Sequence, residues 1–183
     1  GRRLLASLEV IDPGSGMAAI GRTVIEPLSE GQETGPMVSD ILLFEPGEDL
    51  PEGLDAAMKL ARSGTTVPVG SAVGLYWETY RAGAGEAFQV SLAVEQARAG
   101  LLKRVGRTFG LGGKARPIKL SWNGDGGEGV VAQSIEVALA DLPRGRYSII
   151  LTLKRGTEPE LQTIREIEIV ERDVAHERAD VRH

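Results

Sequence analysis

Residues that could bind a sugar are gathered in one short stretch. Tyr76, Glu78 and Tyr80 alternate along Leu75–Arg81, and alternate residues of a β-strand point to the same side. If Trp77 faces the core, the two tyrosines and the carboxylate form an exposed platform, on which rings stack against a sugar and Glu78 accepts hydrogen bonds. The alternative is that the tyrosines pack under a neighbouring loop and Glu78 hydrogen-bonds locally. Aromatic residues make up only 4% of the chain and the core needs most of them, so the alternative is favoured.

Few residues could take part in catalysis or bind a metal. The chain has no cysteine, which excludes disulfides, thiolate zinc sites, iron–sulfur clusters and a cysteine nucleophile. Both histidines, His176 and His183, lie near the C-terminus, so a catalytic triad would have to draw on that end. Carboxylates cluster in one stretch, at Glu45, Glu48, Asp49 and Glu52. Their spacing matches no calcium-binding loop, and we expect no enzymatic activity, no cofactor and no metal ion.

Charge is unevenly distributed along the sequence. The net charge is −5, yet residues 23–58 hold nine acidic side chains and no basic one, and residues 97–123 hold seven basic side chains and no acidic one. The predicted basic patch consists of Lys103, Arg104, Arg107, Lys114 and Arg116. Such a patch fits an acidic partner or an anionic envelope component such as polysaccharide or lipid headgroups, or else the acidic segment of the chain itself. The alternative is that the two segments are solvated loops of opposite sign.

Nucleic acid and a membrane interior are not expected partners. The sequence pI is about 5.2, and only Phe109 and Trp122 could stack on bases near the basic patch. No apolar run approaches the roughly 20 residues that cross a bilayer as a helix. The chain begins with Gly1 instead of methionine, and we expect it to be part of a longer protein.

Alternation of apolar and polar residues predicts a protein built from short β-strands. The pattern is clearest in Ala87–Gln96, in Val130–Leu139 and from Tyr147 to Leu153. Weaker candidates bring the number to about nine: Leu4–Ile11, Met17–Ile25, Ser39–Phe44, Leu75–Arg81, Pro117–Trp122 and Thr163–Val170. Many short strands separated by glycine- and proline-containing turns favour an all-β fold, an immunoglobulin- or fibronectin-like antiparallel β-sandwich.

The connections between these strands have predicted forms as well. Asp12–Gly16 and Asn123–Glu128 have the composition of hairpin turns. Glu45–Val67 is too long for a plain loop, and a short helix is predicted within it from the spacing of Leu54, Ala57, Met58 and Ala61. A second helical turn or two is predicted within Gly100–Phe109.

The last predicted strand contains an irregularity, and a different kind of segment follows it. Ile164 and Ile167 fall on opposite sides of an ideal strand, which a bulge near Arg165 and Glu166 would reconcile. We expect a single β-sandwich domain over residues 1–170. Residues 171–183 are mostly charged and are expected to form a disordered tail.

Local strings along the chain resemble a bacterial family. They are Leu8-Glu9-Val10, Ser39-Asp40-Ile41-Leu42-Leu43, Gly74-Leu75-Tyr76-Trp77-Glu78-Thr79-Tyr80 and Asp141-Leu142-Pro143-Arg144-Gly145-Arg146-Tyr147. In this order they resemble the C-terminal, immunoglobulin-like β-rich domain of bacterial GWxTD-domain-containing envelope proteins, over roughly Leu4 to Val170. The GWxTD motif itself is absent from the chain. The resemblance implies a non-catalytic interaction or spacer module of a larger periplasmic, secreted or envelope-associated protein, with no catalytic residue to carry over.

Three aromatic residues are assigned structural roles. Tyr147 follows the turn Leu142–Gly145, where the tyrosine of a β-sandwich can return its hydroxyl to the backbone and fix the corner between two sheets. The alternative is that Tyr147 is an ordinary core residue. Trp77 and Trp122 are assigned to the core.

Overall fold

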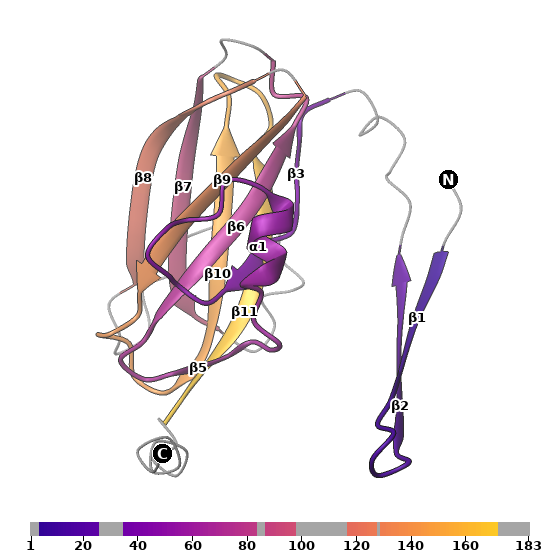
Figure 1. Ribbon diagram of the computed structural model, residues 1–183. Coiled ribbons are helices and arrows are strands. Elements are labelled where there is room, and N and C mark those ends of the chain that lie inside the picture. Colours follow the sequence, from indigo (N-terminus) through magenta and orange to yellow (C-terminus); the bar gives the residue numbers. More distant parts are fainter. Residues whose placement is uncertain (1–3, 26–34, 84–86, 98–116, 128, 172–183) are drawn as a thin grey trace. The chain divides into compact units, whose positions relative to one another are not determined.

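The chain divides into two compact units, Gly1–Gly35 and Pro36–His183. In this computed structural model, residues 4–25, 35–83, 87–97, 117–127 and 129–171 are described. The first unit contains one β-hairpin and the second a β-sandwich, which confirms the predicted all-β sandwich (Figure 1). Among the described residues the hairpin strands pair only with each other, and the predicted single domain of residues 1–170 stays a prediction. From residue 172 onward, the predicted tail lies outside the described residues.

The hairpin consists of β1 (Leu4–Ile11) and β2 (Ala18–Ile25), which pair antiparallel along their whole length. The predicted turn at Asp12–Gly16 is confirmed, since the Gly16 amide donates to the Asp12 carbonyl over 2.9 Å. Gly16 has a φ of +68°, a left-handed conformation that glycine adopts without steric cost. The turn composition alone was therefore enough to locate this hairpin.

The Asp12 carboxylate organises the turn from within. It accepts hydrogen bonds from the Ser15 hydroxyl over 2.5 Å and from the Gly14 amide over 2.9 Å. These bonds, the one from Ser15 above all, hold the pKa of Asp12 below its usual value. The side chain thus supplies acceptors to polar groups that the tight backbone leaves without partners.

The larger sheet of the sandwich has five strands. Their order across the sheet is β5 (Thr66–Pro68), β11 (Leu161–Val170), β10 (Gly145–Lys154), β7 (Ala87–Gln96) and β8 (Ile118–Asp125). All neighbours are antiparallel except β5, which runs parallel to β11. β5 and β8 therefore form the two edges of this sheet in the described part of the chain.

The smaller sheet is built around β6 (Ala72–Tyr80). β9 (Val130–Ala138) pairs along one side of β6. β3 (Met37–Val38) and β4 (Leu42–Phe44) pair in succession along the other side. The nine strands from β3 to β11 form the sandwich, and the hairpin brings the described strands to eleven. The nine predicted segments include both hairpin strands and miss the short strands β3 and β5.

A bulge separates β3 from β4. Val38 pairs with Thr79 and Leu42 with Tyr76. The chain therefore advances four residues from β3 to β4 while β6 advances three, which leaves one extra residue between β3 and β4. The Ser39 hydroxyl accepts a hydrogen bond from the backbone amide of Glu78 over 2.9 Å. The backbone amide of Ser39 donates one to the Glu78 carbonyl, also over 2.9 Å. A side-chain oxygen therefore replaces the main-chain acceptor that the extra residue displaces.

The core lies between the two sheets and is filled by the inward residues of the alternating strands. Trp77 is buried there, and Trp122 packs against the core half-buried, with the two rings 6.2 Å apart and tilted by 52°. Tyr147 is also buried, and its hydroxyl donates to the Pro143 carbonyl over 2.9 Å. This is the hydrogen bond that the predicted corner requires.

The helix predicted in the long connection is α1 (Leu54–Lys59). It covers the side of β6 that faces away from the larger sheet (Figure 1). Of the four residues whose spacing predicted the helix, only Ala57 is fully buried, because it packs in a small cluster with Phe44 and Tyr76 on that side of the sheet. Leu54 and Met58 are exposed. The second predicted helix, in Gly100–Phe109, lies outside the described residues.

Two local predictions were wrong. Asn123–Glu128 does not join a hairpin, because β8 pairs with β7 and β9 pairs with β6, so the chain crosses here from one sheet to the other. No bulge reconciles Ile164 with Ile167, since β10 and β11 pair without interruption. Instead Ile167 is buried and Ile164 is exposed on the outer face. Both errors arise because a local pattern does not specify the partner strand or require every apolar residue to be inside.

Candidate interaction surface

Tyr76, Glu78 and Tyr80 lie on the same side of β6, as predicted, and are hydrogen-bonded to one another. The Tyr76 hydroxyl donates to one oxygen of Glu78 over 2.7 Å, and the Tyr80 hydroxyl donates to the other. Burial raises the pKa of Tyr76, with help from the bond to Glu78. The hydrogen bond to Glu78 is the main reason that the pKa of Tyr80 is raised. Both tyrosine hydroxyls therefore stay protonated and donate their hydrogen bonds to the Glu78 carboxylate.

These three residues do not form the exposed sugar platform. Tyr76 is only 2% exposed and packs with Phe44 and Ala57. The connection that carries α1 is held over this side of the sheet, where the Ser134 hydroxyl donates to the Pro51 carbonyl over 2.9 Å. The structure matches the other interpretation, in which the ring is covered and the carboxylate bonds locally. Sequence alternation identified the shared side but could not show what covers it.

The predicted basic patch cannot be placed. Lys103, Arg104, Arg107, Lys114 and Arg116 all lie outside the described residues. Its use in binding an anionic partner therefore remains a prediction.

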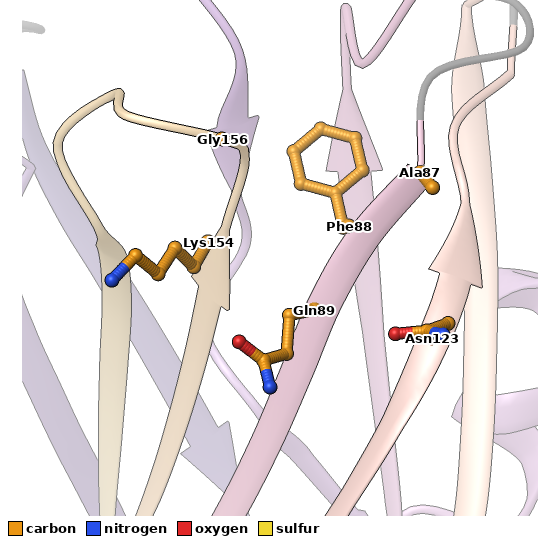
Figure 2. A pocket seen from close by; sticks show the side chains of 6 residues that line it. All are labelled: Ala87, Phe88, Gln89, Asn123, Lys154 and Gly156. Atoms are coloured by element: carbon orange, nitrogen blue, oxygen red, sulfur yellow. The ribbon is translucent and has the colours of Figure 1, made fainter.

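A shallow hollow of about 370 Å³ lies at one end of the larger sheet. Its lining residues are Ala87, Phe88, Gln89, Asn123, Lys154 and Gly156 (Figure 2). Lys154 points away from Gln89 and forms an ion pair with Glu160, with 3.6 Å between Nζ and Oε1. The polar side chains thus do not converge on one point, as the groups of a specific ligand site do.

The hairpin carries the most conspicuous surface of the described chain. Of 15 large hydrophobic residues that are exposed, eight lie in this hairpin: Leu4, Leu5, Leu8, Val10, Ile11, Met17, Ile20 and Val24. Leu8, for example, is 69% exposed. An isolated two-stranded hairpin is marginally stable in water, and contiguous exposed apolar surface marks interaction sites.

The two sides of the hairpin differ in charge. One side, named here the uncharged face, consists of Leu4, Ala6, Leu8 and Val10 of β1 with Ala19, Gly21 and Thr23 of β2. The opposite side carries Glu9 and Arg22 among its apolar residues. The sequence contained a signal for this arrangement. The adjacent pairs Leu4-Leu5 and Val10-Ile11 place large apolar residues on both sides, unlike a strand with one solvent-facing side.

Comparisons with known proteins add no functional information. No protein-family model matches the chain, and no curated protein matches it in sequence. The soluble domain of PmoD from Methylocystis sp. ATCC 49242 (Rockwell) is 10% identical, with a TM-score of 0.38, over 73% of this chain and 90% of that one. The β-glucosidase EmGH1 from Erythrobacter marinus is 13% identical, with a TM-score of 0.39, over 75% of this chain and 16% of that one. At such TM-scores neither structure supports a conclusion about this chain.

In the described part of the chain, no helix has the length and apolarity needed to span a membrane.

Proposed function

We propose that this chain is a non-catalytic interaction module of a larger exported, envelope-associated bacterial protein, and that the hairpin β1–β2 is its main contact surface. The observation that carries this proposal is the concentration of exposed apolar side chains on the hairpin. Water contact with so much apolar surface is unfavourable, and a protein partner that covers it would gain the free energy of its burial. The sandwich then acts as the body that holds this surface.

A protein partner fits this surface better than a sugar does. The exposed large hydrophobic residues of the hairpin are leucine, isoleucine, valine and methionine, with no aromatic ring among them, whereas sugar rings stack on aromatic faces. Tyr76, the first residue of the alternative platform, is covered. The basic patch supplies a second, charge-driven contact in this proposal, for an acidic segment of the partner or of the envelope.

The proposal is tested by capture from an envelope extract of the source organism with the immobilised chain. We expect a saturable protein partner that is retained by the native chain and lost when Leu8 and Ile20 are both replaced by lysine. The matched control is Met58→Lys, since Met58 is 56% exposed but lies on α1. Capture that is equally strong with the hairpin variant contradicts the proposal.

A salt series separates the two contacts. Capture through the hairpin should persist at high salt, because burial of apolar surface is not screened. A contact through the basic patch should weaken steeply, since exposed charges are screened over roughly 8 Å at physiological ionic strength. Replacing Lys103, Arg104 and Arg107 by glutamate should remove only the salt-sensitive part.

A further inference from the structure

In the described part of the chain, one side of the sandwich is incompletely covered, along β8. Within the described residues β8 pairs with β7 only, so its other edge presents main-chain groups without a strand partner. Three of its side chains point inward, opposite buried residues of β7, yet Leu120 is 37% exposed, and Ile118 and Trp122 are half-buried. We call these three residues and the adjacent edge the open seam. Free backbone groups beside exposed inward apolar residues are what a missing strand would leave.

Strand β1 of the hairpin matches such a missing strand in its length and in its pattern of apolar residues. β1 and β8 are both eight residues long. The β1 residues of the uncharged face, from Leu4 to Val10, recur at every second position, as inward residues of a sandwich strand do. The outer edge of β1 is also unpaired in the described chain, because β1 pairs only with β2.

We propose that β1 of one copy of this chain adds antiparallel to the edge of β8 in a second copy, with Glu9 opposite Lys119. This inference rests on the proposed function and identifies the partner of the hairpin as a second copy. The register that follows places Val10 opposite Ile118, Leu8 opposite Leu120 and Ala6 opposite Trp122, all pointing inward. On the outer side it places Ser7 opposite Ser121.

Charge and size select this register. Opposite charges directly across two strands stabilise their pairing, and Glu9 is the only charged residue of β1. The small side chain of Ala6 leaves room beside the indole of Trp122, while Leu8 covers Leu120. A shift by one residue would turn Ser7 and Glu9 toward the core, because side chains alternate along a strand. The parallel arrangement with the same charge pair would place Ser7 opposite Pro117, which has no amide hydrogen to donate.

The two surfaces that meet in this contact are different, so the contact is heterologous. Each copy both donates a hairpin and offers an open seam. Two copies can exchange hairpins reciprocally, or successive copies can form a chain. In either arrangement, β1 and β8 become interior strands of one extended sheet.

The test uses sedimentation velocity of the full chain over a concentration series. The native chain should self-associate. Leu8→Lys disables the hairpin and Leu120→Lys disables the seam, and each variant alone should be monomeric, with affinity reduced about tenfold or more by an unpaired charge in the contact. An equimolar mixture should form a 1:1 complex, because the intact hairpin of Leu120→Lys docks on the intact seam of Leu8→Lys. Met58→Lys should associate like the native chain.

Three outcomes would overturn the inference. The first is a native chain that stays monomeric at all concentrations. The second is self-association of Leu120→Lys alone, which would mean that hairpins bind each other. The third is a mixture of the two variants that does not associate although circular dichroism shows both to be folded.

A second test reverses the charges of the Glu9–Lys119 pair and leaves the three inward apolar residues of the open seam unchanged. Lys119→Glu should weaken association, and Glu9→Lys added to the same chain should restore it, whereas a general loss of folding would not be restored. Failure of the rescue contradicts the proposed register. If the chain remains monomeric but still captures another protein through its hairpin, this inference fails while the proposed function stands.

Discussion

At the level of single residues, Glu78 organises the outer side of β6. Two tyrosine hydroxyls donate to its carboxylate, and one of the rings is buried under the connection that carries α1. A carboxylate that accepts two hydrogen bonds stabilises both protonated hydroxyls. The residues that resembled a sugar platform therefore hold a covering loop against the sheet.

The stabilisation of the protonated tyrosine hydroxyls by Glu78 should be measurable in an alkaline titration that follows the absorbance of tyrosinate. All three tyrosines of the chain, Tyr76, Tyr80 and Tyr147, have a pKa raised above 10.0. Glu78→Gln should lower the pKa of Tyr80 more than that of Tyr76, for which burial is the larger cause. Because the folded pKa values exceed the unfolded one, the protonated tyrosines stabilise the fold below pH 10, and this contribution is lost as pH rises through the folded values. An unchanged titration in Glu78→Gln would contradict the role given to the carboxylate.

Tyr147 gives a second prediction at this scale. Tyr147→Phe removes the hydrogen bond to the Pro143 carbonyl but keeps the buried ring. We expect the free energy of unfolding to fall by about 1 kcal/mol, the usual net value of one such bond. Urea denaturation measures this loss, and the slope of the free energy of unfolding against urea concentration should be unchanged. A variant as stable as the native chain would mean that the ring alone fixes the corner.

At the level of elements, the small cluster under α1 depends on one glycine. Phe44 of β4 lies directly across from Gly74 of β6, and a Cβ at Gly74 would come within 2.2 Å of the Phe44 ring. The ring therefore occupies the space that a side chain at residue 74 would need. Glycine is unfavourable in the interior of a strand except where such a close approach requires it.

Gly74→Ala should accordingly destabilise the sandwich. The methyl group would displace Phe44 from its cluster with Ala57 and Tyr76, and we expect a loss of roughly 1–3 kcal/mol, as for other overpacked sites. The matched control is Gly47→Ala, because a Cβ at Gly47 meets nothing within 4 Å. Equal stability of the two variants in thermal or urea unfolding would show that Phe44 relocates without cost.

At the level of the whole molecule, the chain has a well-packed sandwich and a hairpin with little buried surface. Local stability follows buried contacts, so amide hydrogens of β1 should exchange much faster than those of β7 and β10 in dilute solution. At concentrations where the chain self-associates, protection should rise in β1 and β8 together, because the proposed contact pairs their edges. Hydrogen exchange at two concentrations measures this. Added protection in β1 without any in β8 would point to another partner for the hairpin.

The class of fold and much of the local structure follow from patterns in the amino-acid sequence. Alternation located every described strand except the short strands β3 and β5. The spacing of Leu54, Ala57, Met58 and Ala61 located α1, and the turn before Tyr147 identified the corner. These features depend on neighbours a few residues away. Their signals are therefore contained in short stretches of sequence.

The pairing of the strands and the cover of each sheet face became known only from the three-dimensional fold. In the tertiary structure β8 and the following β9 belong to different sheets, Tyr76 is buried under α1, and β1 and β2 pair with each other. Alternation shows that one side of a strand is apolar, but it does not show what lies against that side. That choice is made by pairing and burial between residues distant in sequence, whose free energy depends on the arrangement of the whole chain.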